Sequence, residues 1–460
     1  MPIHISADYK KAFRDADIRG IYPTEIDEEA TYLIARAFVD EYEHKEVIVV
    51  RDMRLSSPAL HAAFVKGVTD AGANVIDLGL ATTPMLYYAS GTMKLPGVAI
   101  TASHNPKNYN GLKLVLPGAI PLTEAHGLKA VRRRMEKGVF SEAKKLGKVK
   151  TKDVKDVYLK HVLKGVRSKE VSGLKVAIDC GNGMSSVLMS KLEAKLPVKF
   201  TTLYTELDGR FPNHGSDPTL SKNQRGITKL LKTTDHDFGI AFDGDADRVA
   251  FFDEKGRYVN SAVIGAIIAK RLLKTQPGAK IVYTTLTSRV LEETIKSSGG
   301  KAVGARVGHA FIKETMRQKD VLFGCEHSGH FYFKEFFYTD SAVLTFRYVL
   351  EAFAEAKKAG MNFSQMVAPY LRYEQTEDVI VEVDHRPAAL EAVRQLLLKK
   401  PLCKVKKFDG YTFDLGSVWG SVKISVTEPA LKMMFEGKKC KEAQALQDEV
   451  ADFVRQIAHD

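Results

Sequence analysis

Short apolar runs alternate with longer segments of helical hydrophobic spacing along most of the chain, and this rhythm occurs three times. Each repeat is predicted to begin with a buried strand, at residues 47–50, 176–178 and 281–283. A helix and a second strand follow, the second strands at residues 75–78, 200–203 and 302–304. A third strand then leads into a polar loop, at residues 97–100, 238–242 and 321–323. The pattern predicts three related α/β units.

The last quarter of the chain has a different pattern. Strand-like alternation at residues 376–383 and a strand near 421–425 are interleaved with predicted helices at about 388–398 and 442–457. We therefore predict three related α/β domains with mixed sheets plus a smaller C-terminal α+β domain, arranged around a central cleft. The predicted domain ranges are 1–150, 151–253, 254–370 and 371–460. Since ligands collect at the carboxyl ends of strands in α/β sheets, the three polar loops are expected to face that cleft.

The first polar loop has the sequence TASHNP at residues 101–106 and continues into YNGLK at 109–113. Ser103 lies on a sharp turn after a strand, and the cation Lys113 follows ten residues later. A serine in a turn is usually structural, because Ser, Asn and Pro favour turns. Turn formation does not require this whole run, however, and its order favours nucleophilic or phosphoryl-carrying chemistry at Ser103.

The second polar loop places Asp243, Asp245 and Asp247 at alternate positions, with Arg248 directly after them. Such a pattern can be an ordinary solvated loop, but here it follows an apolar strand. The Glu that closes an EF-hand calcium loop is missing at the twelfth position. Mg²⁺ takes a few carboxylates and completes its shell with phosphate or water oxygens, so the loop favours a Mg²⁺ site next to a phosphate.

Three further segments carry polar groups. Residues 324–330 bring Glu326, Ser328 and His330 together on one loop, which matches the hydroxyls of a sugar. Gly308 and His309 follow the predicted strand at 302–304. The run SVKISVTEP at 421–429 carries Lys423 and either binds a phosphate or forms a simple strand-to-helix connection.

Composition and charge limit the kinds of protein that this chain can be, but they do not identify its function. The 460 residues are 45% hydrophobic and 27% charged, which is typical of globular proteins. A net charge of +12 with scattered lysines favours phosphate-bearing metabolites over nucleic acid or membrane, although a solvated basic surface gives the same count. Four cysteines without paired spacing indicate reduced thiols. The chain has no run of 18 apolar residues and no signal-like start, so we expect a cytoplasmic protein.

Taken together, these segments resemble the α-D-phosphohexomutase superfamily, most closely its phosphomannomutase/phosphoglucomutase branch. Matching motifs occur in the expected order over nearly the whole chain, at residues 13–20, 51–54, 101–113, 179–183, 211–214, 243–248, 308–309, 324–330 and 427–429. Ordered agreement of this many motifs is highly specific. The resemblance also implies a fold of three related α/β domains and a smaller fourth one.

The resemblance implies a reaction and a cofactor. The family moves a phosphoryl group between O1 and O6 of a hexose, with a hexose 1,6-bisphosphate as intermediate and activator. It implies that Ser103 is carried as phosphoserine and that Asp243, Asp245 and Asp247 hold Mg²⁺ against the Ser103 phosphate. The partners expected are small sugar phosphates, with no nucleic acid and no membrane; the sequence does not predict the oligomeric state.

Roles for other residues also follow from the resemblance. The further catalytic residues are Arg19, Lys113, Arg248, His309 and His330, with Lys113 and His309 both open as the acid or base. Glu326 and Ser328 are expected to recognise the sugar, and Lys423, Ser425 and Thr427 to bind the phosphate that does not react.

Some positions depart from the family pattern. Ala16 replaces a frequent tyrosine, and Leu286 stands where some relatives have a lysine. In the fourth domain, Lys423 and Val426 stand where arginine and asparagine are usual. Lysine keeps the positive charge but loses the planar fork of arginine, so the departures bear on phosphate affinity and sugar specificity rather than on the chemistry.

Two alternative functions remain open at this stage. A phosphoglucosamine mutase shares the machinery but usually has Gln in the sugar loop, where this chain has His327. A non-catalytic sugar-phosphate-binding relative is the second alternative, and the intact Ser103 and aspartates weigh against it. The sequence therefore favours a mutase of mannose and/or glucose phosphates.

Overall fold

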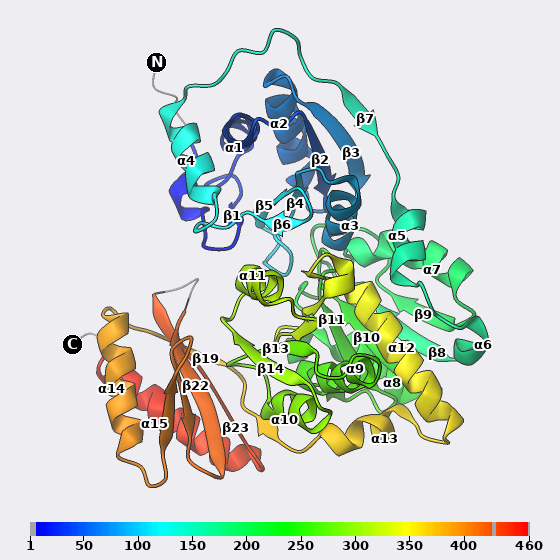
Figure 1. The fold of residues 1–460 in the computed structure, drawn as a ribbon, viewed down its shortest axis with the longest axis vertical. Helices are drawn as coiled ribbons and strands as arrows, with labels where there is room; N and C mark the ends of the chain where they lie inside the picture. The colour runs from blue at the N-terminus through cyan, green and yellow to red at the C-terminus, as the bar shows by residue number, and fades with distance from the viewer. Residues whose placement is uncertain (1–5, 426–428, 459–460) are drawn as a thin grey trace. The chain divides into compact units, whose positions relative to one another are not determined.

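A computed structural model describes residues 6–425 and 429–458 (Figure 1). The contacts divide the chain into two compact units. The first unit comprises Met1–Val259 and Ser328–Met366, and the second comprises Asn260–His327 and Val367–Asp460. This division does not test the four predicted domain ranges, which remain predictions.

The first sheet of the first unit is mixed and has the strand order β1-β5-β4-β2-β3-β7, with β6 paired to β5. Its strands are β1 (Ile18–Ile21), β2 (Glu46–Arg51), β3 (Asn74–Leu80), β4 (Gly97–Ile100), β5 (Tyr109–Leu116), β6 (Ile120–Pro121) and β7 (Val149–Thr151). Its helices are α1 (Glu28–Tyr42), α2 (Ser57–Asp70), α3 (Thr83–Met93) and α4 (Leu128–Lys137), after the 3-10 turn η1 (Tyr9–Lys11). β2 runs parallel to β3 and β4, whereas β5 is antiparallel to β4. The turn between β4 and β5 is the loop that carries Ser103.

The second sheet of the first unit is also mixed, in the order β12-β11-β10-β8-β9. Its strands are β8 (Lys175–Asp179), β9 (Lys199–Leu203), β10 (Phe238–Phe242), β11 (Val249–Asp253) and β12 (Tyr258–Val259). The helical segments are α5 (Lys155–Val162), α6 (Ser168–Val171), η2 (Met184–Leu188), α7 (Met189–Lys195), η3 (Ser221–Asn223) and α8 (Arg225–Thr233). β10 is parallel to β8 and antiparallel to β11, so the turn from β10 to β11 projects Asp243, Asp245 and Asp247 from the carboxyl end of β10.

A later segment of the chain completes the first unit. It contains β16 (Phe331–Phe333), η4 (Lys334–Phe336), β17 (Thr339–Asp340), α12 (Ala342–Lys358) and α13 (Phe363–Val367). Phe353 and Phe363 lie against Phe238 of β10, with ring centroids 5.5 and 4.8 Å from that ring. The segment is therefore packed on the second sheet through aromatic contacts.

The second unit contains a parallel set of strands and an antiparallel sheet. In the first of these, β13 (Lys280–Thr284) is parallel to β14 (Lys301–Ala305) and to β15 (Phe323–Cys325). The accompanying helices are α9 (Ser261–Thr275), α10 (Arg289–Ser297) and α11 (His309–Lys319).

The C-terminal sheet has the order β18-β23-β22-β21-β20, with β19 paired to β23. Its strands are β18 (Glu374–Gln375), β19 (Val379–Glu382), β20 (Lys404–Lys407), β21 (Tyr411–Asp414), β22 (Val418–Ile424) and β23 (Ala430–Gly437), after η5 (Ala368–Tyr370). Two helices, α14 (Arg386–Leu398) and α15 (Cys440–Gln456), share one hydrophobic core with this sheet. Amphipathic helices on one face of an antiparallel sheet are the α+β arrangement that the sequence predicts.

Most of the predicted strands are confirmed, and β4 and β10 have the predicted bounds. Some bounds differ from the prediction. The stretch predicted as strand-like at 376–383 forms β19 only at Val379–Glu382, α15 begins at Cys440 rather than at about 442, and β15 begins at Phe323 rather than at residue 321. The reason for the last difference is that Val321 N–H donates to Met316 O at 2.9 Å, which ties residue 321 to the end of α11. α14 begins at Arg386, two residues earlier than predicted, because Pro387 is well tolerated in a first helical turn. Among the described residues, no helix is both long enough and apolar enough to cross a membrane.

His44, just after α1, gives the first unit an acid-sensitive contact. Its ring stacks on Tyr42 and meets Phe38 edge-on, with centroids 5.5 and 4.6 Å away. Burial lowers the pKa of His44 from 6.5 to about 4. Because the folded-state pKa is depressed, the stabilisation is complete above the unfolded pKa and is lost as pH falls from about 6.5 toward 4.

We predict that His44→Phe reduces the acid sensitivity of folding. A single extra proton bound by the unfolded state changes stability by at most about 1.4 kcal/mol per pH unit, and partial solvent exposure reduces this figure. The free energy of unfolding, measured in denaturant at pH 7 and pH 4.5, should fall less in His44→Phe than in the wild type. Equal falls in both proteins would contradict the prediction.

Candidate active site

Ser103 lies in the turn between β4 and β5, in a left-handed backbone conformation with φ of 52°. Its N–H donates to Thr101 Oγ1 at 2.9 Å, and Asn105 N–H donates to Ala102 O at 3.0 Å. A positive φ is costly for a non-glycine residue and persists only where the surroundings enforce it. The turn therefore holds the Ser103 hydroxyl in one direction.

Arg54, three residues after β2, is what enforces this turn. Its buried guanidinium donates four hydrogen bonds of 2.6–2.9 Å to the carbonyls of Ser103, Asn105, Pro106 and Tyr109. Asp52 lies on the other side, with Oδ2 3.2 Å from Arg54 Nε. A guanidinium has five N–H donors in one plane, more than any other side chain, so Arg54 can hold four carbonyls of the serine loop at once and acts as a clamp.

The second loop folds around the carboxylate of Asp243. Asp243 Oδ1 accepts the N–H groups of Asp247 and Arg248, both at 3.1 Å. Asp243 Oδ2 accepts the hydroxyl of Ser103 at 2.8 Å, across 140 residues of sequence. The predicted phosphoserine and the predicted metal loop thus meet within the first unit.

Gly244 allows the Ser103 loop and the aspartate loop to approach each other closely. A Cβ atom at this position would lie 2.6 Å from the carbonyl oxygen of Ser103, closer than real side chains approach backbone. Glycine is therefore required between Asp243 and Asp245 for the two loops to approach each other.

Lys113 lies beneath the three aspartates. It is on β5 opposite Ala99 of β4, and its Nζ donates to Asp245 Oδ2 at 2.7 Å and to Asp247 Oδ2 at 2.6 Å. Burial alone would lower the pKa of Lys113, but Asp245 and Asp247 outweigh burial and raise it. Lys113 is therefore an ammonium at neutral pH in this arrangement.

The pKa values of the three carboxyl groups are shifted in different directions. Burial, together with Asp247 and Asp245, raises the pKa of Asp243 well above its usual range. Burial also opposes ionisation of Asp247, but Lys113 and His330 outweigh it and hold the pKa of that carboxyl well below its usual range. The pKa of Asp245 is lowered because Lys113 and the hydroxyl of Thr83 outweigh burial and the neighbouring charge. Asp245 and Asp247 therefore ionise beside Lys113, whereas ionisation of Asp243 is favoured only by a further positive charge at the cluster.

The same carboxylates have the donor set of a hard divalent cation. One oxygen from each of Asp243, Asp245 and Asp247 lies within 4.8 Å of the others. Asp245 Oδ1 is buried and has no hydrogen-bond partner among the described residues. Buried polar atoms are nearly always satisfied, so an orphaned carboxylate oxygen inside an oxygen cluster fits Mg²⁺.

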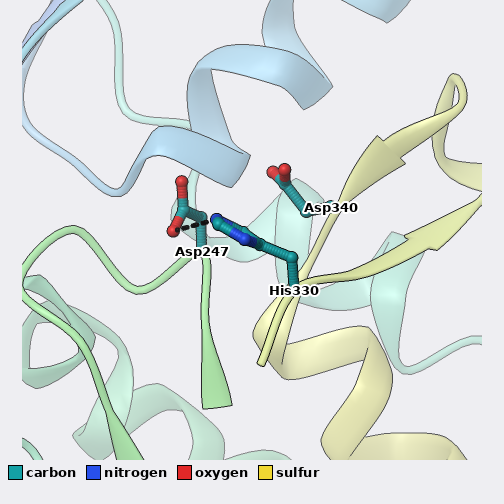
Figure 2. Close-up of side chains that lie close together, drawn as sticks. All are labelled: Asp247, His330 and Asp340. Carbon is teal, nitrogen blue, oxygen red and sulfur yellow. Dashed lines mark ion pairs between the residues drawn. The ribbon is translucent and has the colours of Figure 1, made fainter. Parts of the chain in front are cut away.

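His330 approaches this cluster from the start of β16 (Figure 2). Its Nε2 lies 3.3 Å from Asp247 Oδ1 and 3.3 Å from Arg248 Nε, while Nδ1 lies 3.0 Å from Ser328 Oγ. The nearest ligand atoms of Asp247, His330 and Asp340 lie within 4.8 Å of one another. The imidazole thus lies between carboxylates and a guanidinium, where both of its protonation states find partners.

Arg19 supports the serine loop from β1. Its guanidinium donates to Asn105 Oδ1 and Asp17 Oδ2, both at 2.6 Å. The first unit therefore brings together Ser103, Arg19, Lys113, Arg248, Ser328, His330 and the three aspartates among the predicted site residues.

The remaining predicted residues belong to the second unit. His309 is the first residue of α11, and the preceding N–H of Gly308 donates to Glu326 Oε1 at 3.2 Å. Lys423 and Ser425 lie at the end of β22 and are buried. Thr427 lies outside the described residues, as does Val426.

Four contributing residues were missed by sequence reasoning. Asp52 and Arg54 belong to the family motif at residues 51–54, to which the sequence analysis gave no role. The position of this RDMR motif directly after a predicted strand could have marked the two residues as part of the site. Thr83, whose hydroxyl donates to Asp245 Oδ2 at 2.6 Å, had no signal in the sequence. Asp409, which pairs with Lys423, was recognisable only as part of an Asp-Gly turn.

Comparison with known proteins assigns the class. Three family models match in order: phosphoglucomutase/phosphomannomutase alpha/beta/alpha domain I at residues 10–142, domain II at 156–256 and domain III at 260–373. The chain belongs to this family, within the α-D-phosphohexomutase superfamily.

Particular relatives cover nearly the whole chain. A protein of Xanthomonas campestris pv. campestris described as "phosphohexose mutases" is 33% identical over 92% of this chain and 94% of its own length. A phosphomannomutase of Methanocaldococcus jannaschii is 31% identical, with 97% and 98% coverage. The crystal structure of a phosphoglucomutase/phosphomannomutase family protein from Burkholderia thailandensis superposes with a TM-score of 0.88 at 27% identity, covering 97% of this chain and 98% of that one. The resemblance to the family expected from the sequence is confirmed.

We predict that Arg54→Lys destabilises the serine loop. The three donors of a lysine ammonium cannot satisfy four carbonyls, so at least one would lose its partner, at a cost of about 1–3 kcal/mol in the free energy of unfolding. Turnover should fall more than substrate affinity, because the serine is displaced while the substrate-binding groups remain. Denaturant unfolding and steady-state kinetics measure the two effects. Arg210→Lys is the matched control, since Arg210 is exposed and its guanidinium pairs with the neighbouring Asp208. Equal effects in both variants would refute the clamp.

Proposed function

We propose that this protein is a phosphohexomutase that interconverts hexose 1-phosphates and hexose 6-phosphates, of mannose and/or glucose, through a phosphoserine at Ser103. The observation that carries the proposal is the hydrogen bond from Ser103 Oγ to Asp243 inside the buried aspartate cluster. A hydroxyl held at the edge of a cation site, with Lys113 and Arg248 close by, suits phosphoryl transfer, which depends on positioning and charge neutralisation.

The relatives support the choice of sugar. A phosphomannomutase/phosphoglucomutase of Pseudomonas putida is 33% identical over 95% of this chain. N-acetylphosphoglucosamine mutases share the fold at only 14–15% identity, so they carry no argument about the substrate. A phosphoglucosamine mutase and a non-catalytic relative are therefore not favoured.

The chain's own residues supply the steps. In one half-reaction the phosphoryl group leaves Ser103 Oγ for a hexose hydroxyl, which gives up its proton as the new P–O bond forms. In the other, the phosphoryl group that the hexose carried at the start is transferred to Ser103 Oγ, which gives up its proton, and the hexose oxygen released takes up a proton. Arg19 and Arg54 keep the serine loop in place through both transfers, and Arg248 is placed to neutralise phosphate charge.

His330 is a further candidate for proton transfer, besides Lys113 and His309. Asp245 and Asp247 raise the pKa of Lys113, so Lys113 acts as a base only where a bound cation offsets these carboxylates, because a base must be able to give up its proton near neutral pH. His330 Nε2 faces both a carboxylate and a guanidinium, so the ring can accept and return a proton. His309 stays a predicted acid–base group.

Asp243, Asp245 and Asp247 would hold the Mg²⁺ together with the Ser103 phosphate. When bound, the cation neutralises charge on the phosphoryl oxygens. Glu326 and Ser328 are proposed to read the sugar hydroxyls. Lys423, Ser425 and Thr427 are proposed to bind the distal phosphate. The cytoplasmic location and the absence of nucleic-acid and membrane partners remain predictions.

A steady-state comparison of mannose 1-phosphate, glucose 1-phosphate and glucosamine 1-phosphate tests this function. We expect turnover of one or both of the first two to the 6-phosphate, with a hexose 1,6-bisphosphate supplied. Preference for glucosamine 1-phosphate would support the alternative mutase, and no turnover of any of the three would contradict the proposal.

Ser103→Ala should abolish turnover, because among the described residues no other hydroxyl donates to the Asp243 carboxylate. Intact mass of the purified protein should show one phosphoryl group in the wild type and none in the variant. Ser141→Ala, at an exposed position, is the matched control and should keep both properties. A Ser103→Ala enzyme with near wild-type activity would eliminate the phosphoserine mechanism.

Asp245→Asn should weaken Mg²⁺ activation and slow transfer by about a hundredfold or more, because one carboxylate of the cation site loses its charge. The measurement is a Mg²⁺ titration of the rate together with calorimetric Mg²⁺ binding. Asp235→Asn changes an exposed carboxylate and serves as the control. Unchanged titrations in Asp245→Asn would show that the cation binds elsewhere.

A further inference from the structure

The side chain of Lys423 in the second unit already has an anionic partner. Its Nζ lies 2.5 Å from Asp409 Oδ2, and the two side chains are only 4% and 7% exposed. Burial lowers the pKa of Lys423 even though Asp409 opposes the shift. The ammonium therefore depends on a nearby anion to stay charged.

Asp409 is brought to Lys423 by a tight turn between β20 and β21. Asp409 and Gly410 both have positive φ, 47° and 94°. A Cβ at Gly410 would lie 2.4 Å from Val422 O and 2.7 Å from Lys423 Cα, so only glycine lets the turn close over β22. The turn is thus shaped to place a carboxylate on Lys423.

Two further groups converge on the same carboxylate. Val307 N–H donates to Asp409 Oδ2 at 2.9 Å, and Arg306 Nε lies 3.7 Å from Asp409 Oδ1. Both belong to the loop that leads to His309 at the start of α11. An ammonium, a guanidinium and a backbone N–H around one pair of oxygens form the donor set of a phosphate site.

We propose that Asp409 competes with the distal phosphate of the substrate for Lys423 and thereby sets the affinity for the phosphosugar. This inference rests on the proposed role of Lys423 in phosphate binding. A phosphate dianion carries more charge and more acceptor oxygens than a carboxylate, so it displaces Asp409 from the ammonium at the cost of breaking the ion pair. Asp409 limits phosphate affinity, and Lys423 never remains an unpaired buried charge.

A carboxylate at position 409 could either compete with phosphate for Lys423 or orient Lys423 toward the phosphate, and the two roles predict opposite effects on phosphate affinity. An orienting carboxylate would strengthen phosphate binding, and its loss would weaken it. A competing carboxylate does the opposite, because its loss frees the ammonium. The sign of the affinity change therefore decides between the two roles.

The test is Asp409→Asn, which removes the charge but keeps an oxygen for Val307 N–H, and Asn tolerates positive φ as well as Asp does. We expect the Kd for inorganic phosphate, measured by calorimetry, and the KM for the hexose 1-phosphates to fall by about tenfold, the scale of one charge-assisted hydrogen bond. Phosphate should also raise Tm more in Asp409→Asn than in the wild type, because the ligand then replaces the counter-charge that Asp409 supplied, while Glu326 acts on Lys423 in both proteins.

Two controls sharpen the result. Asp414→Asn removes another carboxylate of the same sheet, one paired with Arg289, and should leave phosphate affinity unchanged. In a Lys423→Ala background, phosphate should bind more weakly, and Asp409→Asn should no longer improve binding, because the residue competed for is gone. Asp409→Ser replaces Asp409→Asn if the latter does not fold.

An unchanged or raised Kd in Asp409→Asn would overturn the proposal. So would an improvement that persists in the Lys423→Ala background, since Lys423 would then not be the group competed for. The proposed function fails separately, by absence of hexose 1-phosphate turnover in the wild type, because phosphate binding is measured without turnover.

Discussion

The repulsion among three buried carboxylates is the constraint around which the first unit is built. Asp243, Asp245 and Asp247 lie within one short turn, and burial makes their negative charge costly. Lys113, from a different sheet, supplies the ammonium that allows two of them to ionise. Asp243 has no such partner among the described cations close enough to offset its burial, and the pKa of this carboxyl stays raised, which is the physical basis of the proposed cation site. The contacts of the Ser103 loop and Lys113 with the aspartate turn therefore serve both the packing of the first unit and the chemistry.

Positioning depends on groups that are not themselves reactive. Arg54 satisfies four carbonyls of the serine loop, and Gly244 leaves room for that loop against the aspartate turn. Both features act on backbone rather than on side chains. This explains why the Ser103 hydroxyl faces Asp243 with a single geometry, which a reaction repeated at two ends of one sugar requires.

Lysine at position 423 gives a different electrostatic balance from the arginine usual in the family. A compact ammonium is easily neutralised when buried, whereas a guanidinium stays charged. Asp409 keeps the ammonium charged, and the same contact makes it a competitor for any incoming phosphate. From the sequence alone, lysine in place of arginine at position 423 suggests weaker phosphate binding. The structure shows in addition that Lys423 is paired with the carboxylate of Asp409.

The sequence was sufficient to predict the fold class, and its polar loops pointed to residues that the structure brings together in the candidate site. Apolar runs predicted β4 and β10, and the polar loops after them drew attention to Ser103, Asp243, Asp245 and Asp247. This was possible because hydrophobic periodicity and the order of motifs are properties of the sequence itself. Three contacts could not be predicted from the sequence: those of Arg54 with the serine loop, of Thr83 with Asp245, and of Asp409 with Lys423. Each joins residues on different elements, and only the packing of sheets and turns decides which buried charge meets which partner.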